Sequence, residues 1–84
     1  MYTVYVIKSQ NRLFHYIGHT SNIENRLRAH NRGKVRSTRP YRPFILIYSE
    51  ECADKSTAFR REMYLKSGAG NIWLRNMLIS RGAW

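Results

Sequence analysis

The sequence predicts an α+β domain in which a small three-stranded antiparallel sheet is flanked by helices, in the order β-β-α-β-α-α. Three short segments are rich in β-branched and aromatic residues, as strands are. Three others combine apolar residues at helical spacing with a capping or breaking residue at one end. The chain has 84 residues, so we expect one domain over residues 1–84.

The first two strands are expected to form an antiparallel hairpin. Residues 2–8 alternate so that Val4 and Val6 share one face of the strand while Tyr5 lies on the other. A short polar segment separates this strand from residues 13–17, which are predicted to form the second strand.

The first helix is predicted over residues 22–31. Ser21 and Glu24 have the spacing of a capping box, in which each side chain bonds a backbone amide of the other residue. Ile23 and Leu27 lie one turn apart and are expected to face the core.

The second half of the chain is expected to supply one strand and two helices. The near-continuous apolar content of residues 44–49 predicts a third strand in a more buried position. A second helix should start at Asp54 or Ser56 and end where the glycine-rich residues 68–70 break it. The third helix is predicted over residues 71–80.

Charge limits the classes of partner. Fifteen Lys and Arg residues against five Asp and Glu give a net charge of +10. Because like charges oppose compactness, the excess indicates a polyanionic partner, either nucleic acid or an anionic membrane surface. The single cysteine excludes an internal disulfide and zinc sites built on cysteine pairs. With no targeting segment or long apolar run, we expect a cytoplasmic protein.

Residues 32–43 are predicted to form a basic loop, because they carry no acid and contain two prolines. Its cations should bind the nucleic-acid backbone, and its tyrosine could stack on an unpaired base. The expected nucleic-acid contacts are Lys34, Arg36, Arg39, Tyr41 and Arg42, with Lys66 outside the loop. Membrane binding is disfavoured because these charges do not lie on a long amphipathic helix.

Two helical positions depart from ordinary packing. Glu62 borders the apolar stripe of the second helix, where a carboxylate is either paired, for instance with Lys66 one turn on, or functional. Arg26 and His30 project from one face of the first helix. A guanidinium beside an imidazole suits a phosphate, although a solvated basic face is the simpler explanation.

Two tyrosines are expected to lie side by side across the hairpin. Tyr5 and Tyr16 would place two phenol groups near one point, where cationic neighbours would lower a phenol pKa and favour a tyrosinate base. The alternative is ordinary cross-strand aromatic packing.

Together these residues resemble the GIY-YIG nuclease superfamily, including the N-terminal domain of its repair incision nucleases. Tyr16-Ile17-Gly18 matches the second half of the family motif. Thr3-Val4-Tyr5 matches the first half at the usual spacing, with Thr for Gly and Val for Ile. Arg26 stands at the catalytic arginine, His30 where the family has histidine or tyrosine, and Glu62 at the metal-binding glutamate.

The resemblance implies a metal-dependent endonuclease that hydrolyses phosphodiester bonds in DNA, selective for strand structure or single strands, with a role such as DNA repair. Glu62 would hold one Mg²⁺ or Mn²⁺ ion, the hard cations suited to oxygen ligands. Arg26 would clamp the phosphate. Tyr5 would activate water with help from His30, and the family leaves room for exchanging the two tyrosine roles.

Other positions are less closely matched. Tyr16 and His19 would position water and phosphate, although His19 stands where the repair incision nucleases have lysine. Asn71 and Asn76 do not fall cleanly on the asparagine that often supports the family's active site. RNA could replace DNA as substrate, and a homodimer or a partner protein could supply selectivity. The alternative function is a non-catalytic, basic nucleic-acid-binding module.

Overall fold

The computed structural model describes residues 1–84, and it confirms the predicted fold class and element order. The strands form one antiparallel sheet in the order β2-β1-β3, so β1 is central. The elements are β1 (Tyr2–Ser9), β2 (His15–Thr20), α1 (Ile23–Asn31), the short 3₁₀ helix η1 (Arg39–Tyr41), β3 (Phe44–Cys52), α2 (Lys55–Lys66) and α3 (Gly68–Ser80).

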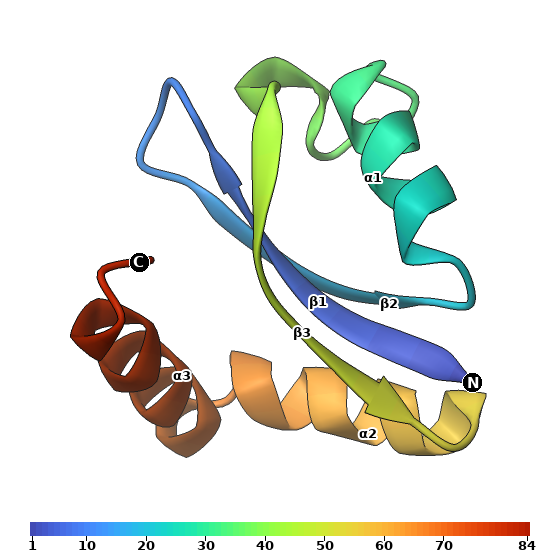
Figure 1. Cartoon of the computed structure of the whole chain (residues 1–84), viewed down its shortest axis with the longest axis vertical. Helices are drawn as coiled ribbons and strands as arrows, with labels where there is room; N and C mark the ends of the chain where they lie inside the picture. Colours follow the sequence, from blue (N-terminus) through green and yellow to red (C-terminus); the bar gives the residue numbers. More distant parts are fainter.

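The sheet lies between two helical layers, with α1 on one face and α2 and α3 on the other (Figure 1). Val4 and Val6 are fully buried against α2 and α3, as their alternation predicts. Tyr5 and Ile7 are buried on the opposite face, in a smaller cluster with Phe44 that α1 covers. The central strand therefore supplies side chains to both halves of the core.

Strand β2 starts and ends later than predicted. It begins at His15, whereas Leu13, the predicted first residue, lies in the turn and is fully exposed. The strand continues through His19 to Thr20, and Gly18 pairs with Tyr5. Pairing with β1, rather than local composition, therefore sets the limits of β2.

Helix α1 is capped by Asn22 and not by Ser21. The Asn22 side chain accepts a hydrogen bond of 3.0 Å from the amide of Asn25. The predicted capping box of Ser21 and Glu24 is therefore wrong, because its first residue precedes the cap. Neighbouring serine and asparagine caps differ little in stability, so the local sequence does not decide between them.

Strand β3 is an edge strand, and the prediction of a buried position for it is wrong. Ile45 and Leu46 remain 43% and 39% exposed. β3 also extends beyond the predicted residues 44–49 to Cys52, with an irregularity in its pairing opposite Val6 and Ile7.

Helix α3 begins at Gly68, directly after Ser67, so the glycine-rich residues open the helix instead of preceding it. A Cβ atom at Gly70 would lie 1.8 Å from the carbonyl oxygen of Tyr64. Glycine is therefore needed at that position because α3 packs closely against the end of α2. Helix α2 is capped by Asp54, one of the two predicted caps. None of the helices combines the length and the apolar character needed to cross a membrane.

Candidate active site

The most buried polar contact joins the central strand to the end of α1. The Tyr5 hydroxyl lies 2.8 Å from Nε2 of His30, and Nδ1 of His30 lies 2.8 Å from Oγ1 of Thr38. His30 and Thr38 are both completely buried, and Tyr5 is 1% exposed. The three side chains form a continuous hydrogen-bonded chain from the sheet into the basic loop.

His30 is neutral at physiological pH. Burial lowers the pKa of His30 from 6.5 to about 4, and the positive charge of Arg26 adds to this decrease. The neutral imidazole has one nitrogen that donates and one that accepts. His30 can therefore accept a proton from a neighbouring group.

The Tyr5 phenol is protonated as well. Burial raises the pKa of Tyr5 to about 12, although the neighbouring Arg26 guanidinium lowers it. The expectation that a cationic surround produces a tyrosinate is therefore wrong, because desolvation of the phenolate exceeds the attraction of the guanidinium. Tyr5 can act as a base only if its own proton moves on to His30.

Arg26 lies against both phenols. Its contacts with Tyr5, and more weakly with Tyr16, raise the pKa of the guanidinium above its usual value. The Tyr5 and Tyr16 ring centroids are 6.3 Å apart, which confirms the predicted neighbours across the hairpin. Arg26, Tyr5 and Tyr16 thus present donors at one point on the α1 face of the sheet.

Gly18 makes this arrangement possible. A Cβ atom there would lie 2.7 Å from the Tyr5 hydroxyl oxygen and 2.9 Å from Cε2 of Tyr16. These separations are too short for any side chain, so only glycine lets the two tyrosines lie over β2.

A second group of polar side chains surrounds Glu62 on α2. One carboxylate oxygen of Glu62 lies 2.6 Å from Nδ1 of His19, and the other lies 2.6 Å from Nζ of Lys66. The Glu62 side chain is only 10% exposed. The pair with Lys66 is the ion pair that the helical spacing allowed, and His19 is a further partner from β2.

These two groups lie on opposite faces of the sheet. Tyr5 and Tyr16 face α1, whereas His19 pairs with Val4 and faces α2. They approach each other around the edge strand β2. Nζ of Lys66 lies 6.0 Å from the Tyr16 ring centroid, and the Glu62 carboxylate contributes to the raised pKa of Tyr5. The two groups of predicted catalytic residues therefore approach each other at this edge and do not share one pocket.

The residues around Glu62 fit a divalent ion only as a sparse site. A carboxylate is a suitable ligand for Mg²⁺ or Mn²⁺. However, no cluster of three or more His, Cys, Asp or Glu side chains is present, and both Glu62 oxygens are already paired. An ion held by Glu62 would need water and phosphate oxygens as its other ligands, and it would compete with Lys66.

The basic loop contacts the site through Thr38, but its cations lie on the surface. Lys34, Arg36, Arg39 and Arg42 are all exposed. Nε of Arg39 donates to the Gly33 carbonyl at 2.7 Å, and Nη1 of Arg42 donates to the Arg39 carbonyl at 2.9 Å. Arg36 makes no side-chain hydrogen bond or ion pair and is free for a phosphate.

The Tyr41 side chain is used within the fold. Its ring stacks on Phe14, with 3.9 Å between the ring centroids and 5° between the planes. The Ser9 hydroxyl donates to the Tyr41 carbonyl at 2.6 Å. This ring anchors the loop to the hairpin, which leaves less of it available to a nucleic-acid base than the sequence suggested.

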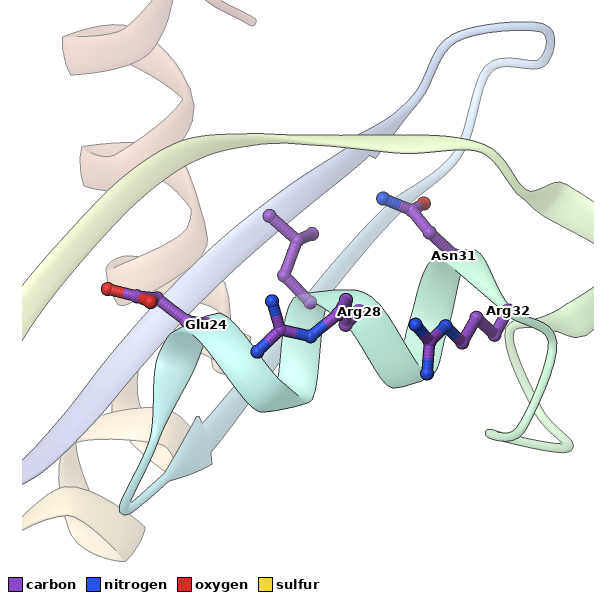
Figure 2. A pocket seen from close by; sticks show the side chains of 5 residues that line it. Glu24, Arg28, Asn31 and Arg32 are labelled. Atoms are coloured by element: carbon purple, nitrogen blue, oxygen red, sulfur yellow. The ribbon is translucent and has the colours of Figure 1, made fainter.

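A hollow of about 450 Å³ runs along the exposed side of α1, away from these groups. Figure 2 shows the side chains of Glu24, Arg28, Asn31 and Arg32 along it. Asn31 accepts from the Phe44 amide at 2.6 Å and donates to the Phe44 carbonyl at 3.3 Å. This residue joins α1 to β3, and the hollow contains none of the predicted catalytic residues.

Sequence reasoning missed Thr38 altogether. A threonine between arginines in a basic loop carries no motif, and its only signal is tertiary: it is buried against His30. The His19–Glu62 contact was also not predicted, because the two residues are 43 positions apart.

Comparison with known proteins shows which family this chain resembles. A model of the GIY-YIG catalytic domain matches residues 1–76. A UPF0213 protein of Staphylococcus haemolyticus is 40% identical over 65 residues, which cover 76% of this chain and 78% of that protein. A UPF0213 protein of Desulfotalea psychrophila is 43% identical over 53 residues, covering 61% of this chain and 48% of that protein. The matched part is thus about half of some relatives.

A solved structure shares the fold. The solution NMR structure of a UPF0213 protein from Bacillus halodurans superposes with a TM-score of 0.53 at 26% identity, covering 90% of this chain and 83% of that one. The family match includes both half-motifs, α1 and Glu62. This chain therefore belongs to the GIY-YIG catalytic domain family, a family of nuclease-type domains.

Proposed function

We propose that this chain is an endonuclease that hydrolyses phosphodiester bonds in DNA with the help of one Mg²⁺ or Mn²⁺ ion. The observation that carries the proposal is the Tyr5–His30 hydrogen bond of 2.8 Å beside the Arg26 guanidinium. A phenol that can pass its proton to a neutral imidazole, next to a cation that can hold a phosphate, provides two of the functions that hydrolysis needs.

The proton steps follow from the hydrogen-bonded chain. A water molecule beside Tyr5 gives a proton to the phenol oxygen while the phenol proton passes to Nε2 of His30. The water oxygen forms a bond to phosphorus, and the bond from phosphorus to the departing oxygen breaks with its electron pair. The departing oxygen then takes a proton from solvent, and His30 is left as an imidazolium until it returns its proton.

Arg26 would stabilise the charge that builds up on the phosphate oxygens, because a guanidinium binds phosphate through two parallel hydrogen bonds. Glu62 would hold the metal ion, which lowers the barrier by neutralising phosphate charge. His19 would orient the Glu62 carboxylate, to which it is bonded at 2.6 Å. Tyr16 would support the bound phosphate beside Arg26.

The net charge of +10 and the exposed arginines of the basic loop favour a DNA substrate bound through its backbone. Contacts to the backbone carry no sequence information, so selectivity would come from strand shape. A second copy of the chain or a partner protein would be another source of selectivity.

One observation favours a second candidate function, a basic nucleic-acid-binding module without catalysis. Both oxygens of Glu62 already have partners, one in an ion pair with Lys66 and the other in a hydrogen bond with His19, as a purely structural carboxylate would have. In this alternative, Glu62 joins α2 to β2 and holds no ion.

Cleavage of labelled DNA separates the two candidates. Single-stranded, duplex and flap DNA would be incubated with Mg²⁺ or Mn²⁺ and with the wild type, Glu62→Gln or Glu51→Gln. Glu51 is an exposed carboxylate in no ion pair, so it is the matched control. If the chain is an endonuclease, Glu62→Gln should lose on the order of 10²-fold or more in cleavage rate, the scale of metal-ion catalysis, and the control should lose none. Equal traces of cleavage in all three preparations would identify a contaminant and favour the binding module.

A further inference from the structure

Thr38 is a completely buried hydroxyl in a mostly exposed basic segment. It precedes η1, and the backbone around it is ordered by hydrogen bonds from the amides of Thr38 and Arg39 to the Val35 carbonyl. Its Oγ1 lies 2.8 Å from Nδ1 of His30 and 3.4 Å from the Val35 carbonyl oxygen. No step of the reaction proposed above uses this side chain.

The donors and acceptors around His30 can be assigned from the groups in contact. The Arg26 guanidinium beside the Tyr5 hydroxyl can only donate, so the phenol hydrogen needs another acceptor. Nε2 of His30 is the acceptor that it contacts. The ring proton of the neutral imidazole must then be on Nδ1. It donates to Thr38 Oγ1, and the Thr38 hydroxyl donates in turn to the Val35 carbonyl.

We propose that Thr38 is a positioning residue: it holds the ring proton of His30 on Nδ1, so that Nε2 is free to accept the proton of Tyr5. This inference rests on the proposed function, in which Tyr5 takes a proton from water. With the ring proton on Nε2, the imidazole would donate to the phenol and could not accept from it, and the base would be lost.

The location of Thr38 gives this hydrogen bond a second consequence. Arg36 and Arg39 lie within two residues of Thr38 and are exposed on the loop that we propose as a DNA contact. A phosphate bound by these arginines would hold in place the turn that carries the Thr38 hydroxyl. The loop would therefore bind the substrate backbone and also keep His30 in the state that catalysis requires.

The test is the position of the ring proton, measured by long-range ¹H–¹⁵N NMR on ¹⁵N-histidine-labelled protein, with His30→Gln used to assign the His30 signals. In the wild type we expect a protonated Nδ1 and an unprotonated Nε2. Thr38→Ser keeps the hydroxyl and should keep this pattern. Thr38→Val has nearly the same shape but no acceptor for Nδ1–H, so its ring proton should shift to Nε2.

Cleavage assays on the same variants give the second measurement. We expect kcat to fall roughly 10²-fold in Thr38→Val, the scale of a missing general base, and to stay within about threefold of wild type in Thr38→Ser. A wild-type proton on Nε2, or a Thr38→Ser variant without the Nδ1 proton, would overturn the inference. The wild-type spectrum can therefore overturn the inference even if Thr38→Val does not fold, and a folded Thr38→Val that keeps its ring proton on Nδ1 would overturn it as well.

The NMR measurement needs no DNA, which separates the two proposals. If the ring proton is on Nδ1 and shifts in Thr38→Val, while the wild type cleaves no DNA, then the positioning role of Thr38 stands and the nuclease proposal fails. If the wild type cleaves DNA with its ring proton on Nε2, the nuclease proposal stands and the role of Thr38 fails.

Discussion

The Tyr5 hydroxyl and Nε2 of His30 lie 2.8 Å apart, although 25 positions separate the two residues in the chain. Tyr5 comes from the centre of the sheet and His30 from the last turn of α1. Burial keeps the phenol protonated and the imidazole neutral, since it raises the pKa of Tyr5 to about 12 and lowers that of His30 to about 4. The pair is therefore set to move a proton without carrying a charge beforehand.

The depressed pKa of His30 makes stability depend on pH. Between about pH 6.5 and pH 4 the unfolded chain binds a proton on His30 that the folded chain does not. The free energy of unfolding should thus decrease as pH falls through this window, by up to about 3 kcal/mol. Urea denaturation of wild type and His30→Gln across the window measures this contribution.

The His30→Gln variant should lose most of that pH dependence. Burial also lowers the pKa of His15, so a His15→Gln variant serves as the control. It should remove only the part of the pH dependence of stability that comes from His15. If His30→Gln and wild type lose stability in parallel on acidification, the burial of a neutral His30 is not the cause.

Gly18→Ala should damage the site more than the fold. Its Cβ would lie 2.7 Å from the Tyr5 hydroxyl oxygen, so the phenol must move away from His30. We expect a rate loss of at least roughly tenfold, with a stability loss of about 1–3 kcal/mol, as for an overpacked core. Cleavage assays and thermal unfolding measure the two effects.

Gly68→Ala is the matched control, because nothing lies within 4 Å of the added Cβ and the residue opens α3. It should leave cleavage unchanged and slightly raise stability. Wild-type cleavage by Gly18→Ala would show that the position of the Tyr5 phenol is not critical.

Lys66→Met should strengthen the binding of Mn²⁺ in the absence of DNA. Nζ of Lys66 lies 2.6 Å from Oε2 of Glu62, so a cation already neutralises this oxygen. Removing it should raise Mn²⁺ affinity by roughly tenfold, which corresponds to about 1.4 kcal/mol. Titration calorimetry on the free protein measures the change.

Two variants complete this experiment. Glu62→Gln should bind Mn²⁺ less tightly than wild type, and Lys55→Met, at the exposed start of α2, should not differ from it. An unchanged or weaker affinity in Lys66→Met would mean that Lys66 does not compete with the ion for Glu62.

The salt dependence of DNA binding should report the basic loop. Removing one cation that binds a phosphate reduces the slope of log affinity against log salt by about 1. Arg36→Gln should show this reduction, because its guanidinium is exposed and bonded to nothing in the protein. Arg39 and Arg42 are less suitable, since their side chains also order the loop backbone.

Arg75→Gln is the control, since Arg75 is exposed on α3, across the sheet from α1. Fluorescence anisotropy with one DNA probe over a range of salt concentrations measures both slopes. A larger effect at Arg75 than at Arg36 would place the DNA on the other face of the molecule.

Much of the architecture could be predicted because the signals are local. Strand alternation assigned Val4 and Tyr5 to opposite faces, and both are buried there. Helical spacing placed Glu62 beside the apolar stripe of α2, and its side chain is buried there with Ala58 and Leu65. These patterns depend only on the periods of strands and helices, which any short segment displays.

Where a prediction from the local sequence was wrong, contacts between segments far apart in the chain outweighed the local preference. The apolar run of β3 suggested a more buried strand, but β1 is the buried central strand because it pairs with both other strands. The glycine-rich residues were expected only to end the second helix. They instead form the start of α3, because Gly70 allows α3 to approach Tyr64 closely.

By itself, the sequence determined the order of the elements, the faces of β1 and the types of side chain available for chemistry. Only the tertiary structure decided which of them meet. It paired Tyr5 with His30, His30 with Thr38, and Glu62 with His19. The reason is physical: residue periods follow from backbone geometry within a few residues, whereas a contact across 25 or 43 positions depends on how whole helices pack on the sheet.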